Sequence, residues 1–216
     1  MPYAAAHEVL RFWFGPDLAD EERAEWFKKD PAFDAEIRRR FGARVEEALA
    51  GGVATWDVTP WGALARLLLL DQFTRNIFRG SGRSFAGDAL ALACAQRLVA
   101  RGDDRRLPGV MRWFVYLPYE HSEDLAVQRE SLRLFAALAA EAPKYAGGLE
   151  WAKKHEAIVA RFGRFPHRNA LLGRASTAEE IEFLKEPGSS FLRGVAPRIT
   201  GPAPAATSCL GHGIAA

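Results

Sequence analysis

The chain has 216 residues, of which 49% are hydrophobic and 26% are charged, and its formal net charge is +2. This length can bury a sizeable core, and the near-neutral charge gives no bulk attraction to nucleic acid or to an anionic membrane. The longest apolar run, at 67–70, is far too short to span a bilayer. The two cysteines form no paired motif, and the N-terminus lacks the basic start of an export signal. We therefore expect a soluble, cytoplasmic protein.

The first half of the chain predicts helices separated by glycine and proline. Residues 4–14 are amphipathic and stop at a Gly-Pro pair, and Asp20 is a candidate cap for a short helix that reaches residue 27. Apolar residues recur every four positions over 33–49, after an Asp-Pro pair that restarts the chain. A long helix then follows over 61–79, with Thr59 as its cap.

The second half continues the same pattern. Helices are predicted around 90–98, 108–117, 122–135, 151–162 and 166–172, and a last one follows a capping box at either Ser176 and Glu179 or Thr177 and Glu180. Pro118 should end the second of these helices, Ser122 should cap the third, and Gly163 should close the fourth. With about ten helices and no alternating strand pattern, the sequence predicts an all-α fold of antiparallel helix pairs.

The pattern shows no linker that divides the body of the chain. We therefore expect one helical domain over 1–192. Residues 193–216 are rich in Ala, Pro and Gly and carry few large apolar side chains, so we expect a loosely ordered tail.

The helix predicted over 61–79 carries polar side chains in line with its leucines. Arg75 follows Asp71 by four residues, and Asn76 follows Gln72 by the same spacing. A carboxylate in a leucine stripe must be paired, because burying it alone is costly. We therefore expect Asp71 to be buried against an arginine, and these four residues to belong to a ligand-binding site.

The stretch PYEHSEDL at 118–125 supplies candidate partners. Glu120 and His121 lie just outside a predicted helix start and could face a pocket, and Gln128 is a polar residue on the apolar stripe that follows. The alternative is that residues 122–124 simply cap the helix and His121 lies on the surface.

The third polar stretch is HEAIVARFGRFPHRN at 155–169. His155 lies on a predicted buried face, where a histidine is either a catalyst or a hydrogen-bonded core residue. A cluster of cationic and amide side chains surrounds the next helix start, namely Arg164, His167, Arg168 and Asn169. Arginines beside free N–H groups make an anion site, with Phe165 as an inward anchor. The alternative is that they pair with Asp71 or other acids and join the helices.

Several chemistries are disfavoured. The sequence contains no His-Glu-x-x-His, Glu-x-x-His or Gly-x-Ser-x-Gly motif, and the glycine-rich turn at 80–87 lacks the Gly-Lys-Ser/Thr ending of a phosphate loop. We predict no cofactor and no metal, although a single metal held by Glu120, His121 and His155 stays possible.

Long stretches of the chain resemble the bacterial family called domain of unknown function 924. They are VLRFWFG at 9–15, LLLDQFTRNIFRG at 68–80, PYEHSEDLAVQ at 118–128, RFGRFPHRNALLGRAST at 161–177 and EEIEFLKEPGSSF at 179–191. The resemblance implies an all-helical fold grouped with tetratricopeptide-like superhelices. It implies no established activity.

The leading hypothesis is a polar pocket for a small anionic ligand that bears a phosphate or a carboxylate. Arg75, Arg164 and Arg168 would hold the anion, and all these polar side chains should converge. The candidates for proton transfer are Glu120, His121 and His155. One alternative is a helical-repeat scaffold that grips a peptide or protein without catalysis, and another is a set of mutually satisfied charges. Neither nucleic acid nor a membrane is expected as a partner, and the sequence leaves open whether any reaction is catalysed.

Overall fold

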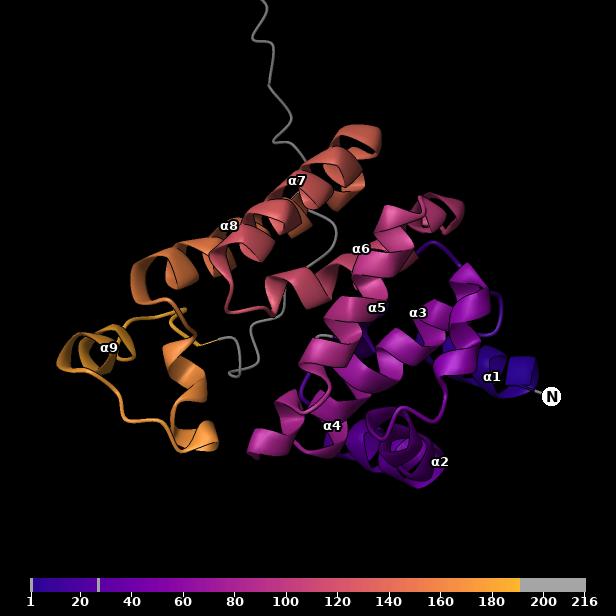
Figure 1. The fold of residues 1–216 in the computed structure, drawn as a ribbon, viewed down its shortest axis with the longest axis horizontal. Coiled ribbons are helices and arrows are strands. Elements are labelled where there is room, and N and C mark those ends of the chain that lie inside the picture. The colour runs from indigo at the N-terminus through magenta and orange to yellow at the C-terminus, as the bar shows by residue number, and fades with distance from the viewer. Residues whose placement is uncertain (1, 27, 191–216) are drawn as a thin grey trace, which may run out of the picture.

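The computed structural model describes residues 2–26 and 28–190, in which every regular element is helical and no strand occurs (Figure 1). The all-α prediction is therefore confirmed. The described residues form the helices α1 to α9, close to the ten or so predicted. Short 3-10 helices join them at Ala24–Trp26, Ala54–Val58, Gly82–Phe85, Asp103–Arg106, Pro143–Tyr145, Pro166–Arg168 and Ala170–Leu172. Phe27 and the predicted tail at 193–216 lie outside the described residues.

The N-terminal helices pack around aromatic rings. Helix α1 spans Pro2–Phe14 and α2 spans Pro31–Leu49. Asp30 caps α2, because its carboxylate accepts hydrogen bonds from the first-turn N–H groups. The Trp13 ring of α1 lies 5.4 Å from the ring of Phe73, which ties the first helix to the centre of the fold.

The central helix contains a wide turn. Helix α3 spans Pro60–Leu68, α4 spans Thr74–Ile77, and the residues between them, Leu69–Phe73, form a π-helical turn. The three segments follow one another without a break, so the helix predicted over 61–79 exists as one rod with a local change of pitch.

This rod runs through the core. Thr59 caps it as predicted, with its hydroxyl oxygen 3.0 Å from the Gly62 nitrogen. The expectation of a single apolar face is too narrow, because all four leucines at 67–70 are fully buried. A helix that is apolar all round must be enclosed on every side, which removes water from around Asp71 as well.

Helices α5 and α6 cover the rod. Helix α5 spans Asp88–Ala100, and the left-handed Gly102, with a φ of 69°, turns the chain toward α6 at Gly109–Glu120. The prediction that Pro118 ends α6 is wrong, because this proline lies inside the helix. Proline has no N–H to donate to the carbonyl of Phe114, so α6 lacks one of its internal hydrogen bonds near its C-terminal end.

Helices α7, at Leu125–Glu141, and α8, at Ala146–Phe162, pack side by side (Figure 1). The short connection between them makes them antiparallel, as the sequence predicts. The cap of α7 is Asp124, whose carboxylate accepts from two N–H groups, and not Ser122. Gly163 closes α8 in the predicted left-handed conformation, with a φ of 67°.

The last described helix, α9 at Ala178–Phe183, lies at the opposite end of the long axis from α1 (Figure 1). Thr177 and Glu180 form the capping box, the second of the two predicted pairs. Phe165 turns inward as predicted and is 1% exposed, in a small apolar cluster with Ile158. None of the described helices is long and apolar enough to cross a membrane.

Two helical glycines should respond to alanine in opposite directions. A Cβ atom at Gly42 in α2 meets only Arg38 Cγ at 4.0 Å, whereas one at Gly148 in α8 would lie 2.6 Å from Phe135 Cδ1 and 2.7 Å from Trp113 Cζ3. Gly42→Ala should raise the free energy of unfolding by about 0.5–1 kcal/mol, because alanine restricts the unfolded chain. Gly148→Ala should lower it by about 1–3 kcal/mol through overpacking. Urea unfolding measures both, and a stabilised Gly148→Ala would contradict the packing described.

Candidate functional site

The site is centred on Asp71, in the π turn. Its side chain has no exposed surface, and Oδ1 lies 2.7 Å from His121 Nδ1 and 3.1 Å from Arg75 Nη1. The Gln72 side-chain amide donates to Oδ2 at 2.5 Å. The prediction that Asp71 is buried against an arginine is therefore confirmed, with an imidazole as a further partner.

The π turn sets the position of the Asp71 carboxylate, and side chains donate hydrogen bonds to the backbone carbonyls of this turn. Widening the helix deprives backbone carbonyls of their usual partners, and such turns are frequent at functional sites. The Thr74 hydroxyl donates to the carbonyl oxygens of Leu70 and Asp71 at 2.8 and 3.1 Å. Arg75 Nη1 also donates to the Asp71 carbonyl at 2.7 Å. Arg75 thus binds both the backbone and the side chain of Asp71.

The protonation of the Asp71–His121 pair follows from its surroundings. Burial alone would raise the pKa of Asp71, but the charge of Arg75 and the hydrogen bonds from His121 and Gln72 hold that pKa well below its usual range. Burial and the Arg75 charge lower the pKa of His121. An ionised carboxylate only accepts hydrogen bonds, so His121 carries its proton on Nδ1 and leaves Nε2 with a free lone pair.

A second carboxylate links two arginines beside this pair. Asp88, the first residue of α5, has Oδ1 2.9 Å from Arg75 Nη2 and Oδ2 2.9 Å from Arg168 Nη1. The charges of Asp71 and Asp88 therefore balance those of Arg75 and Arg168. The Phe85 ring lies beneath both guanidinium groups, 5.9 Å from Arg75 Cζ and 4.5 Å from Arg168 Cζ.

Glu120 and His155 form a second acid–imidazole pair. His155 Nδ1 lies 2.9 Å from the Trp151 carbonyl oxygen and 3.3 Å from Glu120 Oε2. Burial and the nearby Asp71 charge raise the pKa of Glu120 well above its usual value, which favours the neutral carboxyl. Burial, with the charge of Arg168, lowers the pKa of His155.

Aromatic rings extend the cluster to the 3-10 helix at Pro166–Arg168. The ring centroids of His121 and His155 are 6.3 Å apart, and the Phe165 centroid lies 5.6 Å from His155 and 5.5 Å from His167. Burial and the Arg168 charge lower the pKa of His167 to about 3. The chain therefore brings three neutral histidines and two arginines together from separate helices, as the sequence predicts.

Two predicted ligand-binding residues lie outside this cluster, which corrects the expectation that all would converge. Asn76 donates to Asp34 Oδ1 at 2.7 Å and so faces α2. Arg164 donates to both carboxylate oxygens of Glu180, at 2.6 and 2.8 Å, and joins the α8 end to α9. Both arrangements match the alternative in which polar side chains pair to join helices.

Asn169 and Gln128 are buried but have structural partners. The Asn169 amide donates to Ser176 Oγ at 3.0 Å and to Glu180 at 3.2 Å. The Gln128 amide donates at 2.6 Å to the backbone carbonyls of Glu120 and Ser122, and so secures the turn between α6 and α7. Gln128 therefore holds the predicted proton-transfer segment in place from behind.

The sequence interpretation missed Asp88, Glu123 and Arg174. Asp88 resembled an ordinary acidic residue in a first turn, and no local pattern shows that it meets Arg168, 80 positions away. Glu123 resembled a helix-start charge, but its Oε1 accepts from the Phe165 N–H at 2.8 Å and its carboxylate pairs with Arg174. That pair fixes the loop that carries His167.

The alternative of a metal held by Glu120, His121 and His155 has no support in the geometry. No group of three or more His, Cys, Asp or Glu residues in the described part of the chain is arranged to hold a metal ion. Both histidines turn Nδ1 toward oxygen acceptors, Asp71 and the Trp151 carbonyl.

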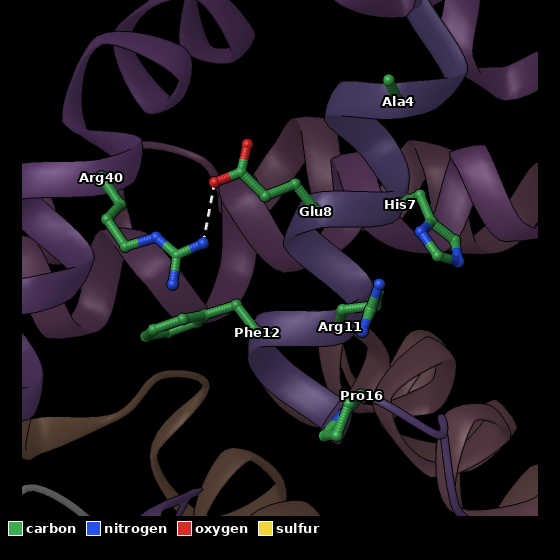
Figure 2. A pocket seen from close by; sticks show the side chains of 7 residues that line it. All are labelled: Ala4, His7, Glu8, Arg11, Phe12, Pro16 and Arg40. Carbon is green, nitrogen blue, oxygen red and sulfur yellow. Dashed lines mark hydrogen bonds and ion pairs between the residues drawn. The ribbon is translucent and has the colours of Figure 1, made fainter.

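Two hollows open on the surface along α1, away from the residues of the cluster. One, of about 460 Å³, is lined by Ala4, His7, Glu8, Arg11, Phe12, Pro16 and Arg40, and Figure 2 shows Glu8 and Arg40 paired across it. The other, of about 550 Å³, is lined by Ala4, Ala6, His7, Leu10, Leu18, Thr59, Trp61 and Gly62. Within the Asp71 cluster the side chains of His121, Arg75 and Asp88 are partly exposed, at 15%, 21% and 18%.

Comparison with known proteins identifies the family. Residues 9–188 match the family described as bacterial protein of unknown function (DUF924). The chain belongs to this family. It is also similar to the solved structure of a protein of unknown function from Agrobacterium tumefaciens, with 38% identity and a TM-score of 0.76 over 87% of this chain and 100% of the other. A search of curated proteins gave no match.

The neutral histidines of this DUF924 chain should make its stability depend on pH. Because the folded-state pKa values of His121, His155 and His167 are lowered, unfolding below about pH 6.5 takes up protons there and stability falls as pH falls. The folded-state pKa of Glu120 is raised, so Glu120 releases a proton on unfolding and offsets the uptake of one of these protons.

We expect a net uptake of about two protons, so the free energy of unfolding should drop by roughly 2–3 kcal/mol per pH unit between pH 6 and 5. Urea unfolding across this range measures the slope, and His155→Gln should reduce it by about one proton. A flat profile would contradict the protonation states given above.

Proposed function

We propose that the Asp71 cluster is a site where a small molecule bearing a phosphate or carboxylate binds and undergoes proton transfer. The observation that carries this proposal is the 2.7 Å contact between His121 Nδ1 and the buried Asp71 carboxylate. It leaves Nε2 of a partly exposed imidazole, 15% by side chain, able to accept a proton. A histidine oriented in this way by a buried carboxylate is a typical general base.

The arginines supply the charge that would bind such a ligand. Arg75 is 21% exposed at the opening, and Arg168 lies behind it at 8%. Guanidinium groups form paired hydrogen bonds with carboxylates and phosphates, and the surrounding apolar rings strengthen those contacts by keeping water away. Bound between the two arginines, an anionic group would bring the rest of the molecule toward His121.

Glu120 and His155 have a supporting role in this proposal. The neutral Glu120 carboxyl is 3% exposed, so it cannot reach a ligand at the opening without movement. Its contact with His155 Nδ1 at 3.3 Å and the edge-on packing of the His155 ring against His121 hold the His121 ring in place. We therefore assign the first proton transfer to His121 and treat the second pair as positioning residues.

A second candidate is peptide binding by the apolar hollow on the other side of the molecule. It is favoured by the exposed side chains of Val58 and Trp61, which are 71% and 37% exposed beside that hollow. This function would involve no chemistry and none of the buried charges.

Titration of the melting temperature with sodium phosphate, at constant ionic strength, tests the proposed anion site. The melting temperature of the wild type should rise with the logarithm of the phosphate concentration. The rise should correspond to about 1.4 kcal/mol of added stability when that concentration is ten times the dissociation constant. Arg168→Gln should lose this rise, because it removes a cation from the cluster.

Arg164→Gln is the matched control, since Arg164 pairs with Glu180 outside the cluster. This variant should melt earlier without ligand but keep the phosphate response. Equal responses from all three proteins, or none from the wild type, would contradict the anion site.

A further inference from the structure

We propose that Asp88 is an internal carboxylate that occupies the anion-binding position between Arg75 and Arg168 and is displaced when a ligand anion binds. The inference rests on the proposed function and deepens it, because it names the residue that controls access and sets the ligand's charge. A ligand must offer these arginines more than a single side-chain carboxylate does.

The geometry of Asp88 is that of a bound carboxylate. Its Oδ1 lies 2.9 Å from Arg75 and its Oδ2 lies 2.9 Å from Arg168, so the carboxylate bridges the two arginines as a ligand would. The contact with Arg168 is a hydrogen bond, whereas that between Oδ1 and Arg75 Nη2 is an ion pair without hydrogen-bond geometry. Neither of those two atoms has a hydrogen-bond partner among the described residues.

Asp88 and Asp71 differ in how firmly they are held. Asp71 is fully buried and bound by Gln72, Arg75 and His121, so it stays in place. The Asp88 side chain is 18% exposed, and within the described part of the chain its ion-pair partners are the two arginines alone. Rotation of that side chain into solvent would free both guanidinium groups without unfolding anything.

Close packing of the backbone places Asp88 beside the π turn. A Cβ atom on the preceding Gly87 would lie 2.1 Å from the Leu70 carbonyl oxygen, so only glycine allows the start of α5 to press against the π turn. Helix α4, which follows the π turn directly, carries Arg75, and the adjoining start of α5 carries Asp88.

Arg168 provides an independent indication of an anion-binding position. Only 8% of this side chain is exposed, and its Nε atom has no hydrogen-bond partner among the described residues. A buried N–H donor without an acceptor is costly, and an oxyanion with more oxygens than Asp88 would satisfy it. Phosphate, with four oxygens, can accept from Nε and Nη1 together while also contacting Arg75.

The test compares phosphate binding to the wild type, Asp88→Asn and Asp34→Asn, by calorimetry at constant ionic strength. Asp34 is the matched control, because it lies in the first turn of α2, pairs with Arg79 and has a side chain 16% exposed. If Asp88 occupies the position in about 90% of molecules, removing its charge should tighten binding about tenfold. Asp34→Asn should leave the affinity unchanged. Asp88→Ser, which also lacks the charge and suits a helix start, replaces Asp88→Asn should that protein fail to fold.

The outcomes separate the two proposals. Tighter phosphate binding by the Asp88 variants than by the wild type supports the inference. Wild-type binding with an equal or weaker affinity in the Asp88 variants overturns the inference and leaves the proposed anion site standing. An absence of binding in every protein overturns both. An equal gain in phosphate affinity in Asp34→Asn overturns the inference, because the change in net charge alone would then explain the effect.

Discussion

The structure depends on one constraint, the burial of the Asp71 carboxylate in the middle of an apolar helix. An ionised group that is removed from water must be matched by charge and hydrogen bonds close at hand. Here Gln72, Arg75 and His121 supply them, and their own requirements recruit further residues. The guanidinium of Arg75 brings in Asp88, and Asp88 brings in Arg168 from the far end of the chain. The segments that carry these residues, from the π turn to the 3-10 helix at Pro166–Arg168, thus meet around the Asp71 carboxylate.

The balance of charges reconciles two interpretations that the sequence left open. With two acids matched to two arginines, and with Glu120 and three histidines neutral, the cluster is stable without any ligand. It is nevertheless built differently from the surface pairs that join helices, such as Arg164 with Glu180. Its members lower or raise each other's pKa values, and buried groups with such shifts are more common at functional sites. The same side chains can therefore stabilise the fold and serve a ligand.

Local signals in the sequence were sufficient for most of the fold. The caps at Thr59 and Gly163 and the box at Thr177 form as predicted, because each depends on residues within one turn. Local signals failed where distant contacts outweighed them. Asp20 resembled a helix cap, but its carboxylate accepts from the N–H of residue 110 and from the hydroxyl of residue 145.

The candidate site was partly predictable for the same physical reason. Asp71 and His155 stood out because they interrupt apolar stripes, and both are buried in the cluster. No pattern distinguished Asn76 from Gln72, since four-residue spacing cannot show which neighbouring helix each side chain meets. The π turn and the role of Asp88 depend on contacts between segments far apart in the chain, and a single sequence carries no record of them.

The most direct measurement of the central constraint is the free energy of unfolding of Asp71→Ala at pH 7, from urea denaturation. Removing the carboxylate leaves the Arg75 charge and the His121 proton without their partner inside the core, so we predict a loss of about 3–5 kcal/mol. Glu150→Ala, which removes an exposed carboxylate paired with Lys153, should change the stability little. A loss for Asp71→Ala no larger than that of the control would contradict the view that this buried charge organises the fold and the site.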